Sequence, residues 1–223
     1  MSAISESPRS DLPIEGRPIA DVIASVQGGS TRALGELLQL YRNYLSVLAT
    51  TQLDKRLRRR MSTSDLVQET MLAAHRDFGQ FRGHSEGELL AWLRKILVNC
   101  LSHAVEKNIH AQKRDMRREV AMERVAQKMD DSMARLSNII ADDAPSPSQI
   151  VSRRELAAEL SDQLAKLKPN YRDVIVYRNL QGLSFDEIAD RMEIKSGAAR
   201  MLWLRAIAKF KDVYDLESPE VSE

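Results

Sequence analysis

Residues 182–206, GLSFDEIADRMEIKSGAARMLWLRA, contain the pattern that decides the fold of this chain. Ser184 and Glu187 have the spacing of a capping box, which predicts the start of a short helix. A tight turn at 193–195, followed by Ser196 as a capping residue, predicts a second helix. The inner face of the first helix would consist of Ile188, Ala189 and Met192. A helix, a short turn and a second helix form a helix-turn-helix, whose second helix enters the DNA major groove.

The second helix of this motif has two different faces. At about 100° per residue, one face collects residues that are expected to pack inward: Ala199, Trp203, Ala206 and Phe210. Trp203 is therefore predicted to lie in the core and not to stack on DNA. The other face carries Arg200, Met201, Leu204 and Arg205. Exposed apolar side chains there would suit thymine methyl groups, and the alternative is an ordinary solvated face.

The rest of the chain also has the apolar spacing of helices, at intervals of three and four, and lacks strand-like alternation. We therefore expect an all-α fold. The single cysteine, Cys100, excludes an intramolecular disulfide and fits a reducing compartment. Neither a signal pattern nor an apolar run of roughly 18 residues is present, so we expect a cytoplasmic protein with no membrane contact. The net charge of +1 identifies no partner.

Composition predicts two small helical domains joined by a charged linker, the second containing the helix-turn-helix. The strongest linker pattern is ADDAPSPS at 141–148, because it is rich in Asp, Pro and Ser. The charged stretch before it carries a weak apolar stripe that predicts a partly packed helix. The expected parts are a disordered tail (1–20), a first helical domain (21–104), a charged connector and linker (105–150), a helix-turn-helix domain (151–215) and an acidic tail (216–223).

Two helix starts are predicted within the first domain. Ser64 is the expected N-cap of a helix that runs to about Phe78. The glycine-rich stretch 79–87 is expected to form a loop. Ser85 and Glu88 then have the spacing of a capping box for the next helix. Its buried side would consist of Leu89, Leu93, Leu97 and Cys100.

Two stretches in this domain, DLVQETMLAAHRDFGQFRG (65–83) and AWLRKILVN (91–99), resemble region 2 of bacterial sigma factors. Followed by the helix-turn-helix, they are similar in order to the extracytoplasmic-function (ECF) subfamily, which carries only regions 2 and 4. The resemblance covers about 30–104 and 151–215. It implies a protein that binds core RNA polymerase and directs promoter-specific transcription initiation. Its partners would be the β′ clamp helices and the β subunit of the polymerase, promoter DNA and, as an open question, an anti-sigma factor.

The resemblance implies that the first of these helices docks on the β′ clamp helices. The matching positions are Asp65, Leu66, Val67, Gln68 and Glu69. Spacing alone places Leu66 and Val67, with Thr70 and Met71, in the core. The polar side would consist of Asp65, Gln68 and Glu69. The alternative for this side is a solvated amphipathic face with no partner.

The second helix carries an aromatic, a cation and an amide within about 60° of one another: Trp92, Lys95 and Asn99. Such a group suits unpaired bases, which stack on aromatic rings. The resemblance implies that this helix and the loop with Arg82, His84 and Ser85 capture unstacked bases of the minus-ten element. It also implies that Asn99 contacts a base. Trp92 could instead seal the edge of the core, and His103 stands where many relatives have Asp.

In region 4 the resemblance implies contacts to the minus-thirty-five element. The matching positions are Ser196, Arg200, Met201, Leu204 and Arg205. Leu202 stands where many relatives have a basic residue, and Met201 where a serine is common. The preferred DNA sequence therefore cannot be borrowed from relatives.

No enzymatic site, cofactor or metal site is predicted. The four histidines and Cys100 lack metal-ligand spacing, and the chain has neither a phosphate-binding glycine loop nor a nucleophile elbow. Two other functions remain open at this point. A repressor or activator would dimerise on duplex DNA without polymerase. An adaptor that sequesters another regulator would leave no DNA footprint.

Overall fold

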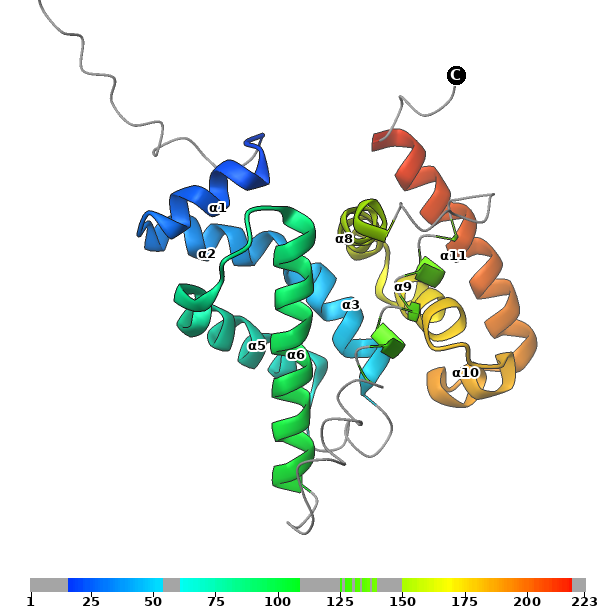
Figure 1. The fold of residues 1–223 in the computed structure, drawn as a ribbon. Helices are drawn as coiled ribbons and strands as arrows, with labels where there is room; N and C mark the ends of the chain where they lie inside the picture. The colour runs from blue at the N-terminus through cyan, green and yellow to red at the C-terminus, as the bar shows by residue number, and fades with distance from the viewer. Residues whose placement is uncertain are drawn as a thin grey trace, which may run out of the picture.

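The computed structural model describes residues 16–53, 61–108 and 150–217, together with 125, 127–129, 131–132, 134–136 and 138–139 (Figure 1). Within these residues all regular secondary structure is helical, so the all-α prediction is confirmed. Most of the predicted tails and the linker at 141–148 lie outside the described residues. Helix α1 already begins at Ile19, and α11 ends at Glu217.

The described residues of the first half form five α-helices and one short 3-10 turn. Two glycines, Gly28 and Gly29, separate the first two helices, and Gly29 has φ +100, which favours glycine. The helices are α1 (Ile19–Gln27), α2 (Thr31–Leu40), α3 (Arg42–Gln52), α5 (Thr63–Asp77) and α6 (Glu86–Asn108), with the 3-10 turn η2 (Phe78–Gln80) between the last two.

Helix α5 begins earlier than its sequence suggested. Ser62, and not Ser64, is the N-cap: its side chain accepts a hydrogen bond from the Asp65 N–H, and the Asp65 carboxylate accepts one from the Ser62 N–H. Ser62 takes this role because a carboxylate stands three residues after it, whereas Val67 stands three residues after Ser64. The prediction of Ser64 as the cap was wrong by two residues.

The predicted start of α6 is confirmed. The Glu88 Oε2 accepts hydrogen bonds from the Ser85 N–H at 3.1 Å and from the His84 N–H at 2.9 Å, and the Glu88 N–H donates to Ser85 Oγ. These bonds satisfy backbone N–H donors at the start of the helix. They also hold the pKa of the Glu88 carboxyl group below the usual range for glutamate, because they stabilise its charged form. The predicted inner face is buried as expected: Leu89, Leu93, Leu97 and Cys100.

The described residues of the second half, 150–217, form four helical segments. Pro169 occupies the first turn of α9, and Gly182 has φ +70 just after the π-helical turn that extends α9. The segments are α8 (Ile150–Lys166), α9 (Pro169–Ile175) with the π turn η4 (Val176–Leu180), α10 (Phe185–Met192) and α11 (Ser196–Glu217).

The two halves share one continuous hydrophobic core, with α3 packed against α5 and α6 on one side and α8 on the other (Figure 1). Residues of the connector enter this core. Met129 and Leu136 are fully buried, and Ser132 Oγ donates a hydrogen bond to the Leu180 carbonyl oxygen at 3.2 Å. The sequence predicted only partial packing here, because a sparse apolar stripe does not show which groove receives it.

Candidate nucleic-acid interface

The helix-turn-helix forms with the caps that its sequence predicts at α10. Ser184 Oγ accepts the Glu187 N–H at 3.2 Å, and Glu187 Oε2 accepts the Ser184 N–H at 2.8 Å. Glu193 ends the helix in the left-handed conformation, with φ +55. Helix α11 begins at Ser196, so this residue is the first of the helix and not its cap as predicted. The backbone reverses over three residues, which is the geometry of a helix-turn-helix.

The two faces of α11 are arranged as predicted. Ala199, Ala206 and Phe210 are fully buried. Trp203 is half-buried against the core, and its Nε1 donates a hydrogen bond to Asn179 Oδ1 at 2.9 Å. The opposite face is exposed and carries Arg200, Met201, Leu204 and Arg205, whose two apolar members are 50% and 49% exposed. Apolar side chains exposed beside two arginines fit base contacts in a major groove.

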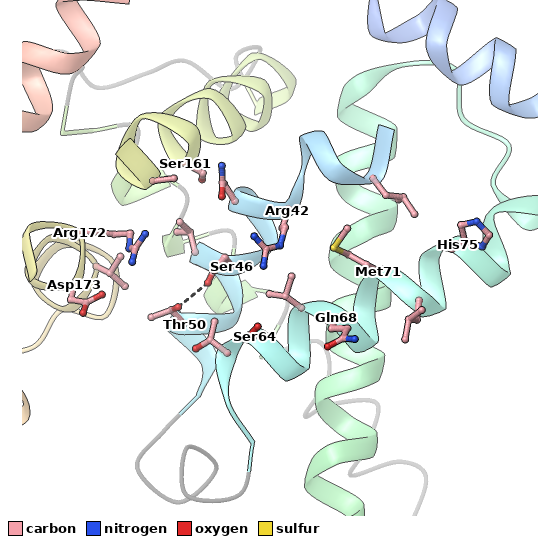
Figure 2. Close-up of a pocket in the computed structure, with 18 of the residues that line it drawn as sticks. Arg42, Ser46, Thr50, Ser64, Gln68, Met71, His75, Ser161, Arg172 and Asp173 are labelled. Carbon is pink, nitrogen blue, oxygen red and sulfur yellow. Dashed lines mark hydrogen bonds between the residues drawn. The ribbon is translucent and has the colours of Figure 1, made fainter. Parts of the chain in front are cut away.

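Helix α5 borders a cavity of about 740 Å³ that separates it from α9. Figure 2 shows Gln68 and Met71 of α5 on one side of this cavity and Arg172 and Asp173 of α9 on the other. Val67 also lines the cavity, although its side chain is almost entirely buried. The predicted core positions of α5 are confirmed by their burial: Leu66, Val67 and Thr70, with Met71 partly buried.

The predicted polar side of α5 is divided by the fold. Gln68 faces the cavity. Asp65 is exposed at the start of the helix, where its carboxylate accepts a hydrogen bond from the Ser62 N–H, and Glu69 is half-buried and does not line the cavity. Leu72, one turn after Gln68, also lines the cavity and is 66% exposed. Leu72 is not among the residues that the sequence predicts for this face. The spacing could have indicated it, because Leu72 stands four positions after Gln68 and residues at that interval lie on the same helix face.

Two hydrogen bonds join the halves near this cavity. Asn43 Nδ2 donates to Asp162 Oδ1 at 2.9 Å, and Gln181 Nε2 donates to the Thr50 carbonyl oxygen at 2.6 Å. Burial raises the pKa of Asp162 above the usual range for aspartate, because the charged form loses hydration. The junction is therefore partly polar, which distinguishes it from the apolar interior of each half.

Trp92 belongs to an aromatic cluster at the edge of the core. Its ring lies 5.7 Å from that of Phe78, edge to face, and 5.3 Å from that of Phe81. Both phenylalanines are buried, while Trp92 is half-buried. Aromatic pairs at these distances stabilise packing. This geometry favours the alternative in which Trp92 seals the core edge.

The loop before α6 is held in one conformation by its neighbours. Gln27 Nε2 donates a hydrogen bond to the Gly83 carbonyl oxygen at 3.0 Å. A Cβ on Gly83 would lie 2.5 Å from Phe81 Cζ, so only glycine fits there. Arg82, His84 and Ser85, the predicted base-contacting residues, are exposed on this loop.

A cavity of about 630 Å³ opens beside the same loop. The residues that line it include Gln27, Arg82 and His84, together with Phe78 and Phe81, which are almost entirely buried. Rings combined with hydrogen-bonding groups are the features that accommodate an unpaired base. The remaining predicted residues follow on α6, with Lys95 exposed and Asn99 half-buried. Trp92, Lys95 and Asn99 are not among the residues that line this cavity.

The described helices include none that is long and apolar enough to cross a membrane. Over the same residues, no group of three or more His, Cys, Asp or Glu side chains could hold a metal ion.

Comparison with known proteins relates the chain to transcription factors of bacteria. Residues 157–210 match the family described as Sigma-70, region 4. The ECF RNA polymerase sigma-E factor of Haemophilus influenzae is 28% identical over 83% of this chain and 89% of its own length. The RNA polymerase sigma-H factor of Pseudomonas aeruginosa is 25% identical over 83% and 88%. The ECF RNA polymerase sigma factor SigE of Mycolicibacterium smegmatis is 27% identical over 71% of this chain and 54% of its own length.

These similarities agree with the geometry described above. The matched region 4 segment contains α10 and most of α11, with the exposed face of the helix-turn-helix. Two of the relatives align over 83% of the chain, which is more than region 4 alone could supply. The chain is therefore similar to ECF RNA polymerase sigma factors over most of its length, and to sigma-70 region 4 over residues 157–210.

Proposed function

We propose that this protein binds core RNA polymerase and directs promoter-specific transcription initiation, as a cytoplasmic regulator without catalytic activity of its own. The observation that carries the proposal is the exposed face of α11, where Met201 and Leu204 remain in solvent between two arginines. Neighbouring apolar side chains that are exposed together and flanked by polar groups are a feature of interaction sites. A promoter major groove, presented by the polymerase complex, is the partner that fits its chemistry.

Region 2 would dock on the polymerase through α5. The proposed contacts are the exposed Asp65 and Gln68, with Glu69 at their edge, on the β′ clamp helices, while the β subunit holds other parts of the chain. Leu66 and Val67 match the family's docking positions, but they are buried here and would support the helix from beneath. Leu72 extends the docking face by one turn and adds an apolar contact.

Region 2 would also capture unpaired bases of the minus-ten element. The loop residues Arg82, His84 and Ser85 are exposed beside the 630 Å³ cavity, and Lys95 and Asn99 continue the surface along α6. A loop fixed by hydrogen bonds loses little conformational freedom on binding, which favours capture of a base.

Region 4 would read the minus-thirty-five element through α11. Arg205 is assigned to a base edge, and Met201 and Leu204 to apolar contacts with bases. Arg200 is assigned to the phosphates, which its position over the Phe185 ring supports. Ser196, at the start of the helix, would lie near the backbone of the DNA.

If the two halves bind the two promoter elements at once, they must separate from the core that they share in the free protein. Elements about 25 base pairs apart, as the names minus ten and minus thirty-five state, are separated by roughly 85 Å of duplex. A compact chain of this length has a radius of gyration of only about 17 Å. The segment between Asn108 and Ile150 can bridge the gap, because about 40 residues extend to roughly 140 Å. Met129 and Leu136 would then leave the core.

Reconstituted transcription tests the proposal. The full chain and core RNA polymerase are incubated with a promoter fragment library, and the start sites of the transcripts are mapped. We expect specific transcripts only when both proteins are present. Failure to associate with any bacterial core polymerase, including that of the host, would refute the proposal. Duplex binding by a dimer without polymerase would indicate a repressor or activator instead.

Asn99→Ala is expected to leave polymerase binding intact and to weaken open-complex formation. The lost base contact should cost about 1–3 kcal/mol, which corresponds to roughly 5- to 150-fold. Permanganate reactivity of unpaired thymines measures the melting directly. Trp92→Ala is the comparison: its packing on Phe78 and Phe81 predicts a lower thermal midpoint as well. A melting defect for Trp92→Ala at an unchanged thermal midpoint would show instead that the ring stacks on a base.

Arg205→Ala is expected to relax the upstream sequence preference at a single position. A bidentate guanine contact is worth about 1–3 kcal/mol and is lost at that position alone. Arg200→Ala should weaken binding to all upstream sequences alike. Binding selections of both variants in the polymerase complex provide the measurement. A changed motif for Arg200→Ala, with uniform weakening for Arg205→Ala, would reverse the two roles.

A further inference from the structure

The cavity of about 740 Å³ between the two halves is lined by one arginine from each half. Arg42 is the first residue of α3, and Arg172 lies on α9. In Figure 2 both side chains extend toward the space between these two helices. Arg42 is exposed and Arg172 is half-buried, so a molecule in the cavity can reach both guanidinium groups.

Neither guanidinium group is neutralised by the part of the chain that the structure describes. No ion pair, hydrogen bond or ring contact there joins Arg42 or Arg172 to another residue. Asp173 is the one acidic residue among those that line the cavity, and it pairs with neither arginine. Two like charges that face one cavity repel each other. An anion bound between them would replace this repulsion with two attractions.

Much of the remaining surface that a ligand would meet is polar. The side chains of Ser46, Ser64 and Gln68 line the cavity and form no hydrogen bonds within the described residues. Accessible apolar surface comes chiefly from Met71 and Leu72 of α5. Other apolar residues of the wall offer little surface, because they are almost entirely buried: Leu38, Val47, Val67 and Val176. Hydroxyl and amide groups without partners on one wall suit a ligand that carries hydroxyl groups.

The two arginines favour a phosphate group as the anion. A phosphate monoester carries a charge of about −1.5 to −2 and three acceptor oxygens, so it can accept hydrogen bonds from both guanidinium groups at once. A carboxylate has only two oxygens, and one bidentate arginine occupies both of them. The volume of about 740 Å³ exceeds the need of a bare ion and falls within the roughly 300–1,000 Å³ of sites for small organic ligands.

We propose that this cavity binds a phosphorylated, hydroxyl-bearing metabolite of the size of a sugar phosphate, whose phosphate group bridges Arg42 and Arg172. Since the lining comes from both halves, the complete site exists only while the halves pack together. Gln68 and Leu72 line the cavity and also belong to the proposed polymerase-docking face. A bound metabolite therefore holds the halves together and weakens association with polymerase. This regulatory effect rests on the proposed function, whereas binding of the metabolite does not.

Isothermal titration calorimetry of the full chain with ribose 5-phosphate tests the site. Ribose 5-phosphate should bind with a Kd below about 1 mM, inorganic phosphate should bind more weakly, and ribose should show no measurable binding. Arg42→Gln and Arg172→Gln should each weaken binding about tenfold or more, because each removes charge-assisted hydrogen bonds. Arg32→Gln is the matched control, since Arg32 is exposed on α2 and does not line the cavity. It should bind within about twofold of the wild type.

A second titration, against labelled core RNA polymerase, tests the regulatory effect. Ribose 5-phosphate at 100 times its Kd should weaken polymerase association of the wild-type chain by up to about 100-fold. Arg172→Gln should bind polymerase like the wild type without the metabolite and should lose this response to it.

Three results would overturn the site. They are a wild-type Kd above about 1 mM, inorganic phosphate binding as tightly as ribose 5-phosphate, and equal loss of affinity in Arg32→Gln and the two cavity variants. If the metabolite binds as expected and polymerase association does not respond to it, the regulatory effect is wrong. If the metabolite binds and the chain never associates with polymerase, the proposed function fails and the site stands.

Discussion

Leu72→Asp is expected to abolish tight association with core RNA polymerase while leaving the fold unchanged. Leu72 is 66% exposed and stands one turn after Gln68 on the proposed docking face. An apolar side chain at the centre of an interface is typically worth about 2 kcal/mol or more, which is roughly 30-fold in Kd. The aspartate adds the cost of burying a charge without a partner. Titration of the full chain against labelled core polymerase measures the change.

Leu216→Asp provides the matched control. Leu216 is 78% exposed near the end of α11, so it undergoes the same substitution outside the proposed docking face. Both variants should unfold within about 0.5 kcal/mol of the wild type, as exposed substitutions usually do. Equal loss of polymerase binding in the two variants would point to a general effect of charge. Unchanged binding by Leu72→Asp would remove this face of α5 from the interface.

Leu136→Ala is expected to destabilise the free protein by about 2–5 kcal/mol. Leu136 lies in the charged connector, yet its side chain is fully buried in the core that the two halves share. Truncation removes apolar contacts and leaves a cavity that the neighbouring helices fill only in part. Urea unfolding followed by circular dichroism gives the free energy of unfolding.

Arg135→Ala is the control, because Arg135 is exposed and directly precedes Leu136 in the connector. It should change the free energy of unfolding by no more than about 0.5 kcal/mol. Met129→Ala, at the other fully buried connector position, should also lower the free energy of unfolding, as Leu136→Ala does. If all three variants unfold like the wild type, the connector does not dock in solution, and the partial packing predicted from the sequence would be the better description.

The sequence by itself determined the helices and most of their faces. The capping boxes at Ser85 and Ser184, and the buried side of α11, follow from side chains a few residues apart. Such local interactions are set by the spacing of residues close in the sequence, so the sequence alone is enough to predict them. Spacing predicts the wrong residue where two serines lie close together: it favours Ser64 as the cap of α5, whereas Asp65 completes a capping box with Ser62.

The tertiary structure decided what lies against each face, because periodicity shows which side of a helix is apolar but not which element covers it. Trp92 has the spacing of a polar face, yet two phenylalanines of the preceding turn and loop pack on its ring. Leu72 is apolar and remains uncovered, whereas Leu136, on a weak stripe, is enclosed. The stack on Phe185 joins residues up to 22 positions apart, Arg178 and Arg200, which only folding brings to one ring. Contacts at such separations depend on the packing of whole helices, and sequence spacing carries no information about them.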